Sequence, residues 1–281
     1  MALELPLPHL AERTLDAINI VTDDALAQEL GVRVVFTGRF GGVSEGPYAS
    51  LNLGAHVGDD LESVLQNRTL LAQAVGCNLE NLISLNQVHG TNLVSVNSAS
   101  PEDVERVWGL ALSEAGADGI IVGVPGVAAL LCFADCVPVA IVSPTGLFAV
   151  VHAGWRGVDA SIASKAVLEM AEAEASLLGG VENAANRYNV YIGPHIRKEC
   201  FETGVDVYER FVAKFGRECA FGDRRISLAD ALRVDLVRVG VSPQRIVDAE
   251  ICTVCNHEEY FSYRASGGVC GRHGALAYRE V

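Results

Sequence analysis

The stretch from Asp118 to His152 reads DGIIVGVPGVAALLCFADCVPVAIVSPTGLFAVVH, and it decides the fold. Turn residues divide it into four nearly continuous apolar segments, at residues 118–124, 127–133, 137–142 and 147–152. Short apolar runs between turns predict strands that are buried on both faces. The connections are too short to hold the crossover helices that parallel neighbours need. We therefore expect hairpin or mixed pairing and not a parallel, doubly wound sheet.

Helical and strand patterns continue on both sides of this stretch. Upstream, we expect a strand at 32–37, a glycine- and serine-rich loop at 38–53, a helix at 59–75, and strands at 82–85 and 93–96. Downstream, we expect a helix at 159–178, a strand at 189–192, helices at 205–215 and 228–239, and a last strand at 245–251. These patterns predict an α/β protein of the α+β type. No linker is visible, so we expect a single domain at 31–281 after a loosely attached N-terminal arm at 1–30.

Composition limits the possible partners and location. The chain has 281 residues, of which 50% are hydrophobic, so it can bury a sizeable core. Its formal charge of −14 should repel phosphate backbones and anionic lipid heads, so we expect no nucleic acid and no membrane partner. The apolar runs are shorter than the roughly 20 residues of a membrane helix, and the N-terminus lacks a signal pattern. Eight cysteines without such a signal indicate a reducing, cytoplasmic setting.

Three short motifs could carry chemistry: QVHG at 87–90, ADCVP at 134–138 and HAGWRG at 152–157. Taken alone, His89 is most simply a polar group satisfied within the fold, and Cys136 a buried thiol. Asp135 favours a functional interpretation, because a carboxylate between core strands must be paired or must orient another group. The glycine-flanked turn after His152, with Arg156, resembles an anion site at a helix N-terminus.

The three motifs together suit a metal. His89, Cys136 and His152 all lie at predicted strand ends, and Cys136 and His152 are separated by one hairpin. Two imidazoles and one thiolate fit an open tetrahedral zinc site whose fourth position holds water. Spacings this loose leave the buried, purely structural interpretation open.

The whole series of motifs resembles the laccase-domain (YfiH-type) family, from about residue 33 to the C-terminus and in the family's order. The motifs that carry the resemblance are NLGAHVGDD at 52–60, NR at 67–68, QVHG at 87–90, ADG at 117–119, ADCVP at 134–138, HAGWRG at 152–157, IGPHI at 192–196, CFE at 200–202, CT at 252–253, FSYR at 261–264 and GR at 271–272.

The resemblance implies a layered α/β sandwich with mixed sheets flanked by helices, and a zinc held by His89, Cys136 and His152. It also implies purine nucleoside phosphorylase activity on adenosine, inosine and methylthioadenosine, with adenosine deaminase activity alongside. Two alternatives remain open: a cysteine-type amidase that edits peptidoglycan precursors, and a copper-dependent polyphenol oxidase. A multicopper oxidase needs about ten or more histidine ligands. The chain has seven histidines in total, so the sequence argues against the oxidase as the main role.

Purine nucleosides and phosphate are the expected partners, and the oligomeric state is left open. The candidate phosphate contacts are Arg156, Arg264 and Arg272, while Asn52 and His56 are expected to line the pocket.

Cys136 has two possible roles. It is either a metal ligand or a nucleophile activated by His152 and oriented by Asp135. Asp118 is a candidate support for the site or a turn cap.

Two features depart from the family pattern, and one competing site remains. Residues 97–116 are longer than the usual connection and resemble a surface excursion, and Phe201 replaces a tyrosine. The competing site is a second, closed zinc site in the tail, whose ligands would be Cys252, Cys255, Cys270 and His273. A strand is predicted at 260–263, between the first two of these ligands and the last two.

Overall fold

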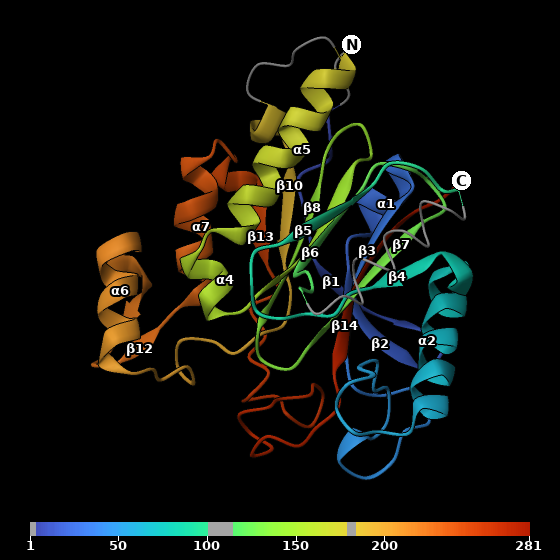
Figure 1. Ribbon diagram of the computed structural model, residues 1–281, viewed down its shortest axis with the longest axis horizontal. Coiled ribbons are helices and arrows are strands. Elements are labelled where there is room, and N and C mark those ends of the chain that lie inside the picture. The colour runs from blue at the N-terminus through green and yellow to red at the C-terminus, as the bar shows by residue number, and fades with distance from the viewer. Residues whose placement is uncertain (1–3, 101–114, 179–183) are drawn as a thin grey trace.

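The computed structural model describes residues 4–100, 115–178 and 184–281, and within them the strands form two six-stranded mixed sheets (Figure 1). The first sheet has the order β1-β2-β3-β14-β7-β4. Its strands are β1 (Ala11–Leu15), β2 (Ile18–Thr22), β3 (Val32–Thr37), β14 (His273–Arg279), β7 (Ala128–Phe133) and β4 (Leu82–Ser84). All neighbours in it are antiparallel except β4 and β7.

The second sheet has the order β13-β10-β8-β9-β6-β5. Its strands are β13 (Ile246–Asp248), β10 (Asn189–Ile192), β8 (Val137–Val142), β9 (Phe148–Ala153), β6 (Gly119–Val122) and β5 (Leu93–Val96). β8 and β9 form an antiparallel hairpin, whereas β5 pairs with β6 and β10 with β13 in parallel. The expected mixed pairing is thus confirmed. The four apolar segments divide between the sheets, since β7 lies in the first and the other three in the second.

Five of the described helices lie on the two outer sides of the paired sheets, as Figure 1 shows with α2 on one side and α4 to α7 on the other, whereas Leu26 of α1 packs into the inner layer. The helix bounds are α1 (Asp24–Leu30), α2 (Leu61–Val75), α4 (Trp155–Asp159), α5 (Ile162–Leu178), α6 (Val205–Phe215) and α7 (Leu228–Arg238). A two-stranded ribbon joins β11 (Ala220–Phe221) to β12 (Arg225–Ile226).

Three apolar layers hold this sandwich together. Because side chains alternate along a strand, Val34 and Phe36 of β3 face the second sheet while Val35 packs toward α2. The inner layer also contains Leu131 of β7 and Val150 of β9, and a third layer joins the second sheet to α5 and α7. Both sheets are therefore buried on both faces in their central strands, which explains the near-continuous apolar sequence from 118 to 152.

Local signals set several helix ends. The Asp60 side chain accepts a hydrogen bond from Ser63 N, and Gly76 ends α2 in the left-handed region with φ 78°. The Ser227 side chain accepts from Asp230 N at the start of α7. The helix predicted at 159–178 is α5, but it begins only at Ile162, because Ser161 adopts φ 63° between α4 and α5. A residue in that conformation cannot continue an α-helix.

Three predictions at the ends of the chain are wrong. The strand predicted at 245–251 is not the last, since β14 follows it and occupies the middle of the first sheet. Residues 260–263 form an irregular segment between two turns and not a strand. The arm is packed and not loosely attached, because β1 and β2 form a hairpin at the edge of the first sheet. The domain boundary near residue 30 stays a prediction.

Residues 101–114, which make up most of the expected excursion at 97–116, lie outside the described residues. Among the helices that are described, none is both long enough and apolar enough to span a bilayer.

Candidate metal centre and active-site pocket

His89, Cys136 and His152 converge on one point, where one donor atom from each lies within 4.8 Å of the others. His89 lies in the loop after β4, Cys136 directly precedes β8, and His152 is in β9. The register of the hairpin places Pro138 opposite His152, so the turn that leads into β8 returns Cys136 to the same edge. We name these three residues the pocket cluster.

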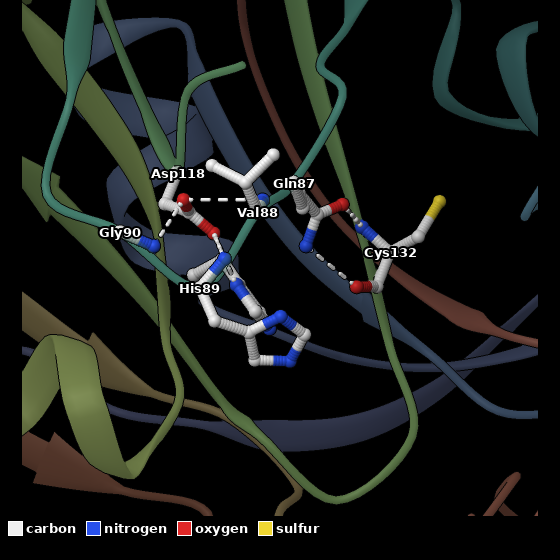
Figure 2. Close-up of polar contacts among 7 residues, drawn as sticks. Gln87, Val88, His89, Gly90, Asp118 and Cys132 are labelled. Carbon is white, nitrogen blue, oxygen red and sulfur yellow. Dashed lines mark hydrogen bonds and ion pairs between the residues drawn. The ribbon is translucent and has the colours of Figure 1, made fainter. Parts of the chain in front are cut away.

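A buried carboxylate, Asp118, fixes the loop that carries His89. Its Oδ1 accepts a hydrogen bond from His89 N at 2.9 Å, and its Oδ2 accepts from Gly90 N at 2.7 Å and Val88 N at 3.2 Å, as Figure 2 shows. His89 has φ 59°, a conformation that is uncommon outside glycine. Three charge-assisted hydrogen bonds hold this backbone and aim the imidazole at Cys136 and His152.

The same carboxylate orients His152. Oδ1 of Asp118 lies 2.8 Å from Nδ1 of His152, and the carbonyl of Asp118 accepts from His152 N at 2.7 Å. Asp118 is fully buried and His152 is 3% exposed, so this contact is shielded from water. Engaging Nδ1 leaves Nε2 as the ring nitrogen available to an ion, an arrangement typical of histidine ligands. The two imidazoles meet edge to face, with ring centroids 4.8 Å apart.

Gly154 makes room for the cluster. A Cβ atom at this position would lie 3.1 Å from Cδ2 of His89 and 3.2 Å from Sγ of Cys136. Both contacts are closer than ordinary van der Waals distance, and both neighbours belong to the cluster. Any other residue at 154 would push the donors apart, which gives the glycine of the HAGWRG motif a physical role.

Charge is strongly coupled within the cluster. Burial opposes ionisation of Cys136, but the charge of His152 and hydrogen bonds from both histidines lower the pKa of the thiol to about 6. Burial likewise disfavours the charged form of His152, yet Cys136 and Asp118 raise its pKa to about 9. The cluster therefore favours a thiolate, which is the form that binds metals and attacks electrophiles.

Asp135 has a different task from the one expected of it. Its Oδ1 accepts from Thr253 Oγ1 and its Oδ2 from Arg264 N, both at 2.7 Å. It adopts φ 90° and connects the turn before Cys136 to the C-terminal segment. Asp118, and not Asp135, orients His152.

The cluster lies in the wall of a cavity of about 680 Å³, a size that suits a small-molecule ligand. Aromatic and apolar side chains supply part of the lining, among them Leu85, Trp155, Phe201 and Tyr263. The cavity combines this apolar surface with the polar cluster, the arrangement expected of a site for a ligand with a flat, partly apolar ring.

The residues predicted to bind substrate divide into two groups. His56, Arg264 and Arg272 line the cavity. Arg156 does not; it is exposed on α4, with its guanidinium 4.4 Å from the centre of the Trp155 ring. Asn52 is buried outside the lining, where its Oδ1 accepts from Gly54 N and Arg272 N. Its role is thus to hold the loop and the backbone of Arg272.

Two lining residues were not singled out from the sequence. Arg68 of α2 reaches the cavity, and its Nε and Nη2 donate to the carbonyl of Leu53 at 3.0 and 2.8 Å. The side chain of Gln87 pairs with both backbone groups of Cys132 at 2.8 Å, which joins the loop of His89 to β7 (Figure 2). Both residues lie within quoted motifs, so their positions in those motifs were the available signal.

A second group of donors lies outside the cavity lining. One sulfur each from Cys200, Cys252 and Cys255 lies within 4.8 Å of the others, and we name these residues the thiol cluster. The four residues suggested as zinc ligands in the tail do not come together, because Cys252 and Cys255 belong to the thiol cluster and Cys270 and His273 do not. Cys270 instead contacts Nη1 of Arg272 through its sulfur, at 3.3 Å, and His273 is buried beside Phe133 and Tyr260.

Comparison with known proteins gives the family. The profile described as multi-copper polyphenol oxidoreductase laccase matches residues 33–280. The chain belongs to this laccase-domain family, as the sequence motifs predicted.

Named relatives cover most of its length. The purine nucleoside phosphorylase YlmD of Geobacillus stearothermophilus is 34% identical over 252 residues, covering 87% of this chain and 89% of the relative. A purine nucleoside phosphorylase of Bacteroides thetaiotaomicron is 35% identical over 260 residues, covering 89% and 92%. Adenosine deaminase RL5, from an unknown prokaryotic organism, is 34% identical over 246 residues, covering 83% and 88%.

Solved structures of the family share the fold. The crystal structure of YlmD from Geobacillus stearothermophilus superposes with a TM-score of 0.78 at 33% identity, covering 89% of this chain and 93% of that one. The Bacillus licheniformis protein YfiH gives 0.82 at 27% identity, covering 96% and 99%. The expected sandwich of mixed sheets and helices is confirmed.

Proposed function

We propose that this protein is a zinc-dependent purine nucleoside phosphorylase that acts on adenosine, inosine and methylthioadenosine and also deaminates adenosine. The observation that carries the proposal is one cavity lined by the pocket cluster, by aromatic side chains and by three arginines. Family membership supports it, because several relatives are named purine nucleoside phosphorylases and one an adenosine deaminase.

The apolar side of the cavity suits the base and the sugar. Trp155, Phe201 and Tyr263 offer ring surfaces, and a purine can stack on such faces. A cavity of about 680 Å³ has room for a nucleoside and a phosphate together. Phenylalanine at 201 provides a wall without a hydroxyl, which leaves that side of the base without a hydrogen bond from this residue.

The arginines suit phosphate. Arg68, Arg264 and Arg272 line the cavity, and the side-chain hydrogen bonds of all three go to backbone carbonyls and, for Arg272, also to the sulfur of Cys270. Carbonyl groups orient a guanidinium without neutralising it, so three positive charges remain for an anion. In this proposal the three arginines take the phosphate-binding role that was expected of Arg156, which lies outside the cavity.

Phosphorolysis requires the phosphate and the nucleoside to meet in line. A phosphate oxygen forms a bond to C1′ as the bond from C1′ to the purine nitrogen breaks, and the electron pair of that bond leaves with the base, which then takes up a proton. Positive charge develops on the ribose, and the bound phosphate dianion stabilises it. The arginines hold the phosphate in place, which is the positioning that this reaction needs.

The donor set fits zinc. Two imidazoles and a thiolate with an open side match catalytic zinc sites, and Asp118 gives His152 the supporting hydrogen bond typical of such ligands. His89, Cys136 and His152 would hold the ion, and copper shares an affinity for these donors. When bound, zinc supplies a Lewis acid that activates water at neutral pH, the chemistry that deamination at purine C6 requires.

A nucleoside panel tests the proposal. Purified zinc-loaded protein is incubated with adenosine, inosine or methylthioadenosine, with and without phosphate, and the products are separated by chromatography. We expect free base and an equal amount of ribose 1-phosphate, or of its methylthio derivative, only when phosphate is present. A zinc-loaded protein that releases no base would overturn the phosphorylase assignment. Conversion of adenosine to inosine without phosphate tests the deaminase activity separately.

One observation favours a second candidate, a cysteine-type amidase acting on peptidoglycan precursors. The spatial arrangement matches that of a nucleophile, a base and an orienting carboxylate, because Cys136 lies beside His152 and His152 contacts Asp118. An amidase of this kind would keep its activity after chelation and lose it on alkylation of Cys136. The metal-dependent phosphorylase should lose its activity in both treatments, so chelation separates the two candidates.

A further inference from the structure

We propose that the thiol cluster of Cys200, Cys252 and Cys255 is a second zinc site, distinct from the pocket cluster and held by three thiolates. None of the three sulfurs belongs to the lining of the cavity. The proposal stands independently of the function proposed above, because it concerns a different set of ligands and a structural role.

The distances suit a shared ion. The three sulfurs lie within 4.8 Å of one another, and those of Cys200 and Cys255 are 3.5 Å apart. Zinc binds thiolate at about 2.3 Å with tetrahedral angles, which places two ligand sulfurs roughly 3.8 Å apart. All three cysteines are free thiols, so each can supply a ligand. Small side-chain movements would bring the cluster to the ideal spacing.

Backbone contacts bring two distant segments of the chain together here. Cys252 forms an isolated parallel bridge with His195, in which His195 N donates to the carbonyl of Ile251 and Thr253 N to that of His195, at 3.2 and 3.1 Å. This bridge lies beyond the paired strands β10 and β13. Cys200, five residues after His195, is thereby placed beside the CTVC segment at 252–255.

Two of the three ligands, Cys200 and Cys252, are also fixed locally. The N–H of Cys200 donates to the carbonyl of Arg197 at 2.9 Å, and its carbonyl accepts from Nη1 of Arg264 at 3.2 Å. The carbonyl of Cys252 accepts from both N and Nδ2 of Asn256, at 3.0 and 2.8 Å. The three thiols thus converge through contacts that need no ion, which lowers the ordering cost of binding one.

Burial and charge favour a cation at this point. Cys252 is buried and Cys255 is exposed, so an ion can arrive from solvent and remain partly shielded. Three thiolates within 4.8 Å of one another repel, and a divalent cation bound between them removes that repulsion. Sulfur-only donors select thiophilic ions, of which zinc is redox-inert.

The site has a structural consequence for the cavity. Phe201, next to Cys200, lines the cavity, and Thr253, next to Cys252, holds Asp135. An ion shared by the two segments would fasten this wall of the cavity to the turn that carries Cys136. The ion would cross-link the two segments and would take no part in the reaction.

Metal content and cobalt spectroscopy test the proposal. Purified protein, reduced and reconstituted with excess zinc, is desalted and analysed for zinc per chain. We expect two ions in the wild type, one in Cys255→Ser and one in Cys136→Ser. Cys77 belongs to neither cluster, so Cys77→Ser is the matched control and should retain two.

The cobalt titration gives a readout that does not depend on any variant folding. The near-ultraviolet band from thiolate to cobalt grows with the number of Co–S bonds, so two loaded sites give about four times the absorbance of the pocket cluster alone. Cys255→Ser should lose roughly three quarters of the band if it loses the ion.

Two results would overturn the second site. One is a wild type that binds a single zinc and shows the absorbance of one Co–S bond at saturation. The other is a reduced protein that binds two ions, both of which remain in Cys200→Ser and in Cys255→Ser.

Discussion

The pocket cluster and the thiol cluster each bring three donors within 4.8 Å, but they are built differently. The pocket cluster rests on β8 and β9 and on a buried carboxylate that orients its histidines, and it opens into a cavity. The thiol cluster rests on loops, and hydrogen bonds to the backbone carbonyls of Cys200 and Cys252 hold it. Ligands that are individually oriented beside a cavity suit chemistry on a substrate, whereas thiols gathered from two loops suit cross-linking. The difference separates a catalytic from a structural centre, and the following variants test it.

The largest effect is expected from Cys136→Ser. This change removes the one thiolate of the pocket cluster, and a catalytic ion typically supplies several kcal/mol, so kcat/KM for nucleoside phosphorolysis should fall on the order of 10³-fold. One zinc per chain should be lost, while the other stays. Steady-state kinetics and metal analysis of the same sample measure both. A variant that loses this zinc and keeps full activity would contradict a catalytic role for the pocket cluster.

Asp118→Asn should have the next largest effect. The amide cannot accept from His152 and from three backbone N–H groups as the carboxylate does, so zinc affinity of the pocket cluster should fall roughly 10–100-fold. Competition with a chelator measures the affinity. Asp23→Asn is the matched control, since Asp23 is buried and hydrogen-bonded to Tyr191 but belongs to neither cluster. Equal losses of zinc affinity in the two variants would argue for a general effect of buried carboxylates.

Thr253→Val tests the contact that links the two regions. The change removes the hydrogen bond from Thr253 Oγ1 to Asp135 Oδ1 and leaves a charged acceptor without that partner, so the free energy of unfolding should fall by about 1.5–3 kcal/mol. Urea denaturation measures it. In Thr22→Val, the lost bond goes to the neutral carbonyl of Val34, and the expected loss is about 0.5–1.5 kcal/mol. A loss in Thr253→Val no larger than in Thr22→Val would mean that Asp135 does not depend on this contact.

Glu199→Gln should give the smallest effect. Glu199 is exposed next to Cys200, and its charge acts on the thiol of Cys255. Removing one exposed negative charge typically changes an interaction by up to about 1 kcal/mol, so zinc affinity of the thiol cluster should fall about two- to fivefold. The same change at Glu209, exposed on α6, serves as the control in a chelator competition. An affinity loss of equal size in both variants would show that only net charge matters.

The sequence predicted the parts of the fold that depend on local pattern. The four apolar segments and the helix at 59–75 were predicted from residue type and spacing. The break between α4 and α5 was not, because Ser161 carries no signal for its left-handed conformation. β14 was missed because HGALAYR contains small residues and follows a turn-rich tail, and its place between β3 and β7 depends on long-range pairing.

The site was predictable in its ligands but not in its supports. Motif order indicated His89, Cys136 and His152, while the choice between Asp118 and Asp135 as the orienting carboxylate depended on geometry. Asp118 directly precedes β6, and Asp135 lies in the three-residue turn between β7 and β8, so both are acidic residues at strand ends and spacing does not separate their roles. Arg156 was expected at the cavity because it follows a glycine turn, but its side chain stacks on Trp155 instead. The thiol cluster joins Cys200 to a CxxC pair far along the chain, and no local pattern connects them.

The position of β14 also determines the order of events during translation. β3 and β7 leave the ribosome long before β14, the strand that lies between them. Phe36 and Leu131 can therefore pair with Ala275 only after the end of the chain has been made. Until then, both strands expose unpaired edges, the kind of surface through which nascent chains associate. Such distant pairing also slows folding. We therefore expect the newly made chain to depend on chaperones that shield strand edges. We also expect its yield in cells to depend more on the time between the synthesis of β7 and of β14 than on the stability of the folded protein.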